Sequence, residues 1–107
     1  MIQPRNNEIT LWLDDRRTPE SQGWDDSYWA RNVDEAIKAF EQYSVTAVSL
    51  DHDVQFDGRS GMTVLEWIRD NDRWPEGGVR IHTTNMDEKP KMLELVRQHY
   101  GRDFQTE

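Results

Sequence analysis

The chain has 107 residues, close to the commonest size of one folded domain, so we expect a single domain over residues 1–107 with its core at about 8–100. Five Trp, three Tyr and three Phe argue against a disordered chain, and the net charge of −8 argues against binding to duplex DNA. The absence of Cys excludes disulfides and thiolate chemistry, and no apolar run is long enough for a signal peptide or a membrane span, so we expect a cytoplasmic protein.

The first part of the chain predicts two strands joined by a long loop. Glu8–Leu13 is a short apolar stretch that stops at the polar, turn-rich run Asp14–Pro19. The residues that follow, to about Ser27, lack a helical apolar period, so we expect an irregular loop there. Tyr28–Arg31 then predicts a short second strand.

A helix and a buried strand come next. Asn32 and Glu35 have the spacing of a capping box, in which two side chains bond backbone amides at the start of a helix. Apolar residues then recur at helical spacing and place one stripe against the sheet. Val45–Leu50 is almost continuously apolar, as expected for a central parallel strand. The stripe consists of Val33, Ala36, Ile37, Phe40 and Tyr43.

The rest of the chain predicts a helix, a strand and a helix. Ser60 can cap a helix that ends before a run of Pro and Gly residues. Val79–His82 predicts a fourth short strand. The last helix is capped by Asn85 or Asp87 and closed by Gly101.

This order of elements predicts an α/β fold. Strands that are separated by helices run parallel, with right-handed crossovers. We therefore expect a truncated doubly wound sheet of the receiver or flavodoxin type, a three-layer sandwich with about four short strands. Ligands of such sheets bind beyond the carboxyl ends of the strands, so the residues after Leu13, Leu50 and Ile81 should share one edge.

Acidic residues gather at that edge. Asp14 and Asp15 follow the first strand, and Asp51 and Asp53 follow the central one. Carboxylates held close together repel one another unless a cation or a proton lies between them, and oxygen ligands suit Mg²⁺ or Mn²⁺. The sequence therefore predicts a divalent-metal site with Asp14, Asp15, Asp51 and Asp53 as ligands.

Imidazole, hydroxyl, amide and guanidinium groups belong to the same edge. A His beside a metal-bound phosphate can act as an acid or a base, so Asp51, His52 and His82 are the candidate catalytic residues. Arginine side chains can clamp a phosphate with two hydrogen bonds, and Arg59 also flanks the edge, unless it only balances nearby acids. The candidate phosphate-binding residues are Thr83, Asn85, Arg16 and Arg17.

The acids allow three other interpretations. Any one Asp could be a turn former or a helix cap, although this explains the whole set poorly. A calcium-binding EF-hand loop from Asp53 is rejected, because its twelfth position is Val64 instead of Glu. Asp51 and Asp53 also resemble the Asp-x-Asp of haloacid-dehalogenase-type phosphatases, whose first Asp attacks phosphorus, but the expected partner Lys is not evident. Whether water or Asp51 would attack stays open.

The motifs resemble receiver domains of two-component signalling, and more closely a divergent branch, the cyclic-phosphate-processing receiver domain family. Relative to ordinary receivers, the first helix is replaced by a loop and the fifth strand with its phosphate-binding Lys is missing. Thr83 replaces the Ser usual in the branch, which keeps the hydroxyl. The matching segments are Leu13–Pro19, Leu50–Asp53, Ser60–Met62 with Trp67–Ile68, and His82–Asn85, within about residues 8–98.

The resemblance implies a metal-dependent phosphoesterase-like domain that acts on phosphate or 2′,3′-cyclic phosphate ends of RNA or nucleotides, linked to RNA repair or to conflict between phages and bacteria. The alternative is a receiver-like adaptor that binds a nucleotide or a partner protein without turnover. The expected partners are a phosphate-bearing small molecule or a single-stranded RNA end, or a partner protein for the adaptor, with no duplex DNA and no membrane.

Overall fold

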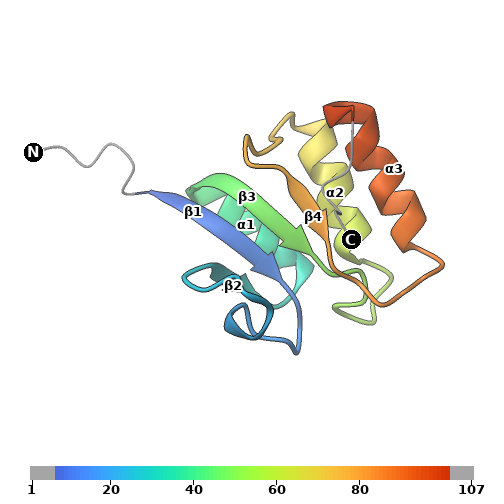
Figure 1. The fold of residues 1–107 in the computed structure, drawn as a ribbon, viewed down its shortest axis with the longest axis horizontal. Coiled ribbons are helices and arrows are strands. Elements are labelled where there is room, and N and C mark those ends of the chain that lie inside the picture. Colours follow the sequence, from blue (N-terminus) through green and yellow to red (C-terminus); the bar gives the residue numbers. More distant parts are fainter. Residues whose placement is uncertain (1–6, 102–107) are drawn as a thin grey trace, which may run out of the picture.

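The computed structural model describes residues 7–101, which form one parallel sheet and three helices (Figure 1). No helix in this described part is long and apolar enough to cross a membrane. The strands are β1 (Glu8–Leu13), β2 (Tyr28–Ala30), β3 (Ser44–Leu50) and β4 (Val79–Ile81). The helices are α1 (Val33–Gln42), α2 (Gly61–Asp70) and α3 (Lys89–Tyr100), with a short 3₁₀ turn, η1, at Glu20–Gln22.

The sheet order is β2-β1-β3-β4, and every neighbouring pair runs parallel. Leu13 pairs with Ala30 on one side and with Leu50 on the other, and Leu50 pairs with Ile81. The four carboxyl ends are therefore level with one another. The order reverses between β1 and β3, as in receiver-like doubly wound sheets, so the predicted fold class is confirmed and the expected binding edge lies beyond Leu13 and Leu50.

The three helices pack on one face of the sheet, where α1 contacts β1, β2 and β3, α3 contacts β4, and α2 lies between α1 and α3 (Figure 1). Alternate residues of the strands point into this layer and are fully buried there. The predicted apolar stripe of α1 and the buried residues of α2 and α3 meet them and complete the core. Its strand residues are Leu11, Leu13, Val48, Leu50, Val79 and Ile81, and its helix residues include Val33, Ala36, Phe40, Val64, Leu65, Ile68, Met92 and Val96.

The other face of the sheet carries no helix among the described residues, so the third layer is the chain between β1 and β2. The Trp12 indole N–H donates to the Arg17 carbonyl at 2.8 Å, and the Trp12 ring packs against Trp24 at 5.9 Å between centroids. Thr10 bonds Ser27 at 2.7 Å. This segment replaces a covering helix and holds the loop after Asp14 over the end of β1.

Local capping explains where the helices begin. Asn32 Oδ1 accepts from the Glu35 amide, and Glu35 reaches back to the Arg31 amide, one residue before the N-cap. Ser60 caps α2 with a reciprocal contact from the Thr63 hydroxyl. The start of α3 differs from the expectation, because Asn85 Oδ1 bonds the Asp87 and Glu88 amides in a turn that precedes the helix. Gly101 closes α3 with a positive φ of 78°, as predicted.

Candidate active site

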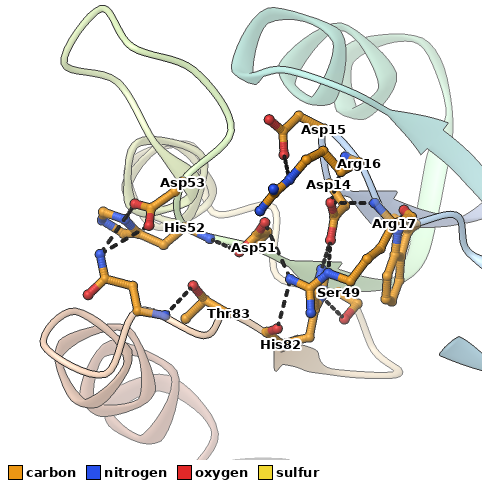
Figure 2. A network of polar contacts seen from close by, with 12 residues as sticks. Asp14, Asp15, Arg16, Arg17, Ser49, Asp51, His52, Asp53, His82 and Thr83 are labelled. Carbon is orange, nitrogen blue, oxygen red and sulfur yellow. Dashed lines mark hydrogen bonds and ion pairs between the residues drawn. The ribbon is translucent and has the colours of Figure 1, made fainter.

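The residues that follow β1, β3 and β4 meet at the carboxyl edge of the sheet, as the sequence predicts (Figure 2). An open hollow of about 400 Å³ lies there. A slightly larger one, of about 430 Å³, lies near Ser44 and Trp74, close to where β3 begins, and contains none of the predicted site residues. The lining residues of the first hollow are Arg16, Arg17, Asp51, Asp53 and Thr84.

Asp14 lies at the base of this site and is 1% exposed. Its Oδ1 accepts hydrogen bonds from the Arg16 and Arg17 amides, each at 2.8 Å. Its Oδ2 accepts from Arg17 Nε at 2.9 Å and from His82 Nε2 at 3.0 Å. Burial raises the pKa of Asp14, but the two amide bonds and the charge of Arg17 outweigh it, so this pKa lies below its usual range. Asp14 is thus an ionised carboxylate that shapes the loop after β1.

Arg17 folds back over the acids instead of pointing into solvent. Besides its bond to Asp14, its Nη2 lies 3.5 Å from Asp51 Oδ2 and 3.4 Å from the His82 carbonyl oxygen (Figure 2). One guanidinium therefore bridges the ends of β1, β3 and β4. It supplies a fixed positive charge beside the carboxylates of Asp14 and Asp51.

Asp51 faces the hollow from the end of β3 and is 6% exposed. Its Oδ1 accepts from the His52 amide at 2.8 Å, and the Thr83 hydroxyl also bonds this carboxyl. Burial raises the pKa of Asp51 above its usual value, and the charge of Asp14 adds to the rise against the effect of these bonds. The ionised form of Asp51 is therefore destabilised in the folded chain, and binding a cation or a proton would relieve this destabilisation.

Gly61 fixes the backbone of Asp51 from behind. A Cβ at this position would lie 1.7 Å from the Asp51 carbonyl oxygen, and the Gly61 amide donates to the His52 carbonyl at 2.9 Å. Only glycine lets the start of α2 approach the end of β3 this closely.

His82 lies beneath the edge and not in the hollow. Its ring stacks on Trp12 with centroids 3.9 Å apart, Nε2–H donates to Asp14, and the Ser49 hydroxyl bonds Nδ1 at 2.7 Å. Burial lowers the pKa of His82 to about 4, although Asp14 opposes the change. The imidazole is therefore neutral at pH 7, and its contacts position Asp14.

A second polar group lies beside the hollow, where the loops after β3 and β4 meet. His52 Nδ1 bonds Asp53 Oδ1 at 2.6 Å, and its Nε2 lies 3.7 Å from a Glu88 carboxylate oxygen. Asn85 donates to both oxygens of Asp53 at 3.3 Å. The hydrogen bond from His52 lowers the pKa of Asp53, against a smaller effect of burial. His52 thus faces two carboxylates and belongs to this outer group.

The remaining predicted residues have distinct surroundings. Asp15 Oδ1 is buried and has no hydrogen-bond partner within residues 7–101, although Arg16 Nε lies 3.9 Å from it. The Arg16 side chain is 88% exposed and lines the hollow. Arg59 bonds Asp34 and Asp57 instead, at 2.8 and 2.7 Å, as expected if it only balances nearby acids.

Residues 9–98 match the family model of the cyclic-phosphate processing receiver domain. This chain belongs to that family. The match includes all the residues of the site, from Asp14 to Asn85. Neither curated proteins nor solved structures gave a match to the chain.

This receiver domain also uses residues that the sequence interpretation did not select. Ser49 and Trp12 hold the His82 ring, the Trp29 indole N–H donates to the Asp14 carbonyl at 2.8 Å, and Thr84 lines the hollow. A signal for Ser49 existed, since it is an isolated hydroxyl in an apolar strand, two positions before Asp51. The Trp contacts join distant segments and leave no local pattern.

Within the described residues, one cluster of the receiver domain could hold a metal ion. It consists of Asp14, Asp51 and His82, and each offers a ligand atom within 4.8 Å of the others. Asp14 and His82 are already hydrogen-bonded to each other, and both oxygens of Asp14 are engaged. Of the four predicted ligands, Asp14 and Asp51 belong to this cluster, whereas Asp15 and Asp53 do not. A cation would relieve the raised pKa of Asp51, and the Asp15 oxygen without a partner is of a type that binds Mg²⁺. Asp53 is more exposed and borders the same hollow.

Proposed function

We propose that this receiver domain is a divalent-metal-dependent phosphoesterase acting on phosphate or 2′,3′-cyclic phosphate ends of RNA or nucleotides. The observation that carries the proposal is the pairing, in one hollow, of a buried carboxylate whose pKa is raised with two arginine side chains. Phosphoester hydrolysis needs positive charge to stabilise the phosphate oxygens and a group that positions or activates the attacking nucleophile. The family's link to cyclic-phosphate processing supports the same substrate class.

The arginines of the hollow would bind the phosphate. Arg16 is exposed and can turn toward a ligand, whereas Arg17 is held in place by Asp14 and offers a fixed guanidinium. Thr84, an exposed residue that also lines the hollow, adds a hydroxyl. For Thr83 and Asn85 the contacts described above indicate a positioning role, because the Thr83 hydroxyl holds Asp51 and the Asn85 amide holds Asp53.

The two histidines would have different roles. His82 holds Asp14 and through it the Arg17 guanidinium, so we assign it to positioning and not to direct proton transfer. His52 is the better candidate for moving a proton, since it is paired with Asp53, which lines the hollow. In hydrolysis of a cyclic phosphate, water adds its oxygen to phosphorus, one ring P–O bond breaks, and the leaving oxygen takes up a proton.

The metal would be Mg²⁺ or Mn²⁺. Asp51 would hold it, because burial and the charge of Asp14 disfavour the ionised form of this carboxyl. Asp15 and Asp53 would be the further ligands, since Asp15 Oδ1 has no hydrogen-bond partner within residues 7–101 and Asp53 lines the same hollow as Asp51. A bound divalent cation supplies polarisation of a phosphoryl oxygen and offsets the repulsion among the acids.

Binding of a phosphate ligand without turnover is the second candidate. The observation that favours it is the position of Arg17, whose charge already lies 2.9 Å from Asp14 and 3.5 Å from Asp51 and partly replaces a metal ion. A module of this kind would bind phosphate and release it unchanged.

The experiment that separates the two candidates is a ³¹P NMR assay of the whole chain with nucleoside 2′,3′-cyclic phosphates and 3′-phosphates, in Mg²⁺, Mn²⁺ or EDTA. The enzyme proposal expects metal-dependent opening to a monoester or release of inorganic phosphate. Shifts of the ligand signals without new species would support the binding module instead. Signals that never change would contradict both.

A further inference from the structure

The guanidinium of Arg17 lies between two carboxylates of the site and is held unequally by them. Its Nε donates to Asp14 Oδ2 at 2.9 Å, whereas its Nη2 lies 3.5 Å from Asp51 Oδ2 and 3.4 Å from the His82 carbonyl oxygen (Figure 2). Hydrogen bonds from N–H to oxygen usually measure about 2.7–3.2 Å, so only the first contact has a normal length. The Nε end of the guanidinium is therefore anchored, and the Nη2 end is loosely held.

One guanidinium does not balance the charge of these acids. Asp14 and Asp51 are 1% and 6% exposed, and both face the single positive charge of Arg17. Asp15 Oδ1 is also buried, and its nearest cation, Arg16 at 3.9 Å, has an 88% exposed side chain. A charge in contact with solvent offsets a nearby carboxylate only weakly. The acids therefore keep a net negative charge, which a divalent cation compensates more completely than Arg17 does.

A cation bound by Asp51 and the Nη2 group of Arg17 would act on the same carboxylate oxygen. Asp51 Oδ1 already accepts from the His52 amide at 2.8 Å, which favours Oδ2, the oxygen that Arg17 faces, as the metal ligand. Two positive groups that share one oxygen repel each other. Arg17 can give way, because its Nη2 contacts are long and its short bond to Asp14 can remain. Its side chain is 34% exposed and lines the hollow, so the displaced Nη2 stays beside the ligand.

We propose that Arg17 competes with the divalent metal for Asp51, and that metal binding transfers its Nη2 from Asp51 to the phosphate of the ligand. This inference rests on the proposed function and adds a regulation of the same site. In the metal-free chain, Arg17 offsets part of the Asp51 charge. Once the metal binds, the guanidinium, still held through Nε by Asp14, can form the paired hydrogen bonds that a phosphate accepts from arginine. Metal and phosphate then favour the binding of each other, by thermodynamic linkage.

A purely structural role for Arg17 explains this geometry less well. A guanidinium that only joined the ends of two strands would gain most from short bonds to both carboxylates. Arg59 has such an arrangement, because it lies 2.8 Å from Asp34 and 2.7 Å from Asp57. The long contact between Arg17 and Asp51 is therefore particular to the site, where a cation would compete for the same carboxylate.

The test measures two Kd values of the full chain by NMR titration, one for Mg²⁺ and one for inorganic phosphate at saturating Mg²⁺. Arg17→Gln places an amide N–H where Arg17 has its Nε, and so keeps a donor for Asp14, but it removes the charge. It should bind Mg²⁺ about tenfold or more tightly, because the competing charge is gone, and bind phosphate about tenfold or more weakly. Arg17→Lys keeps the charge, so its Kd for Mg²⁺ should stay within about threefold of the wild-type value.

Arg80→Gln is the matched control. It changes the net charge of the chain by the same amount, at an exposed position of β4. Solvent and salt screen such a charge, so both Kd values should stay within about twofold of wild type.

A measurement on wild type checks the transfer without any substitution. Addition of Mg²⁺ should move the ¹⁵N side-chain signals of Arg17 with the same midpoint as the backbone signal of Asp51. Arg17 signals that stay unchanged while the Asp51 signal saturates would overturn the inference.

The opposite changes expected in Arg17→Gln separate the inference from the proposed function. If Arg17→Gln leaves Mg²⁺ binding unchanged or weakens it, Arg17 does not compete with the metal and the inference is wrong, while the proposed function stands. If its phosphate binding is unchanged, no transfer to the phosphate occurs, which also contradicts the inference. If wild type binds neither Mg²⁺ nor phosphate, the proposed function fails and this inference fails with it.

Discussion

The burial of His82 predicts a domain that loses stability under mild acid. The folded state holds this imidazole neutral between Trp12, Ser49 and Asp14, with its pKa lowered to about 4 from an ordinary 6.5. The unfolded chain therefore binds more protons than the folded one between these values, so stability is full above pH 6.5 and declines as the pH falls toward 4. This difference between the two pKa values corresponds to about 3 kcal/mol of unfolding free energy, a large share of the roughly 5–15 kcal/mol by which a small domain is stable.

Carboxylates contribute outside this window or against it. Asp14 and Asp53 have lowered pKa values, so the stability that they provide is lost only below their ordinary 3.8. Asp51 has a raised pKa, so its proton uptake favours the folded state as the pH falls and partly masks the loss. A variant that replaces only the imidazole isolates the contribution of His82 to the pH dependence of stability.

The assay is urea unfolding at intervals from pH 4.5 to 7.5. His82→Gln keeps an N–H donor for Asp14 but cannot titrate in this range. The free energy of unfolding of wild type, relative to that of His82→Gln, should therefore fall by about 2–3 kcal/mol from neutral pH to pH 4.5. His99→Gln, which removes an exposed imidazole of α3, is the matched control and should keep the wild-type slope. A wild-type free energy of unfolding that is flat from pH 4.5 to 6.5, or a His82→Gln profile with the same slope, would refute the reasoning.

Three further predictions concern the metal, the backbone and the ligand. If Mg²⁺ binds the folded chain with a Kd of about 1 mM, then ~10 mM adds roughly 1.4 kcal/mol and raises the Tm by several degrees. Asp51→Asn should raise the Tm of the metal-free chain and shrink the Mg²⁺ shift; a variant that is merely destabilised would show Asp51 to be only a structural residue. Gly61→Ala should lower the free energy of unfolding in urea by at least about 2–3 kcal/mol, because its Cβ would meet the Asp51 backbone. The control Gly23→Ala meets no atom within 4 Å and should cost only the strain of its positive φ. Equal losses in the two variants would contradict the close approach of Gly61 to Asp51. Binding of mononucleotide phosphates, measured by fluorescence anisotropy competition, should require metal and weaken with salt. Tight binding of duplex DNA at physiological salt would contradict the conclusion that the net charge of −8 prevents it.

Much of the fold follows from local patterns in the sequence. β1 has the predicted bounds, and the caps at Asn32 and Ser60 form because a side-chain oxygen is placed where the first amides of a helix lack partners. Parallel pairing then follows from the alternation of strands and helices and brings Asp14 and Asp51 to one edge without any knowledge of side-chain contacts.

The contacts within the site could not be obtained in this way. Asp14 proves to be a turn former as well as a site residue, since its Oδ1 accepts the amides of Arg16 and Arg17. Its Oδ2 is held by His82, which is distant in the chain, and the rotamer of Arg17 depends on acids from two different strands. Such choices are set by packing between distant segments, so the sequence indicated which residues meet and not how they pair.

The most direct test of the account is the rate at which the purified chain opens adenosine 2′,3′-cyclic phosphate in Mg²⁺, measured in parallel for wild type, Asp51→Asn and the surface variant Tyr28→Ala. We expect turnover by wild type and Tyr28→Ala that EDTA abolishes, and a loss of about 10²-fold or more in Asp51→Asn, because this carboxylate is central to the proposed metal and phosphate site. Activity that survives in Asp51→Asn, or a wild-type rate no greater than that of buffer alone, would contradict the central claim.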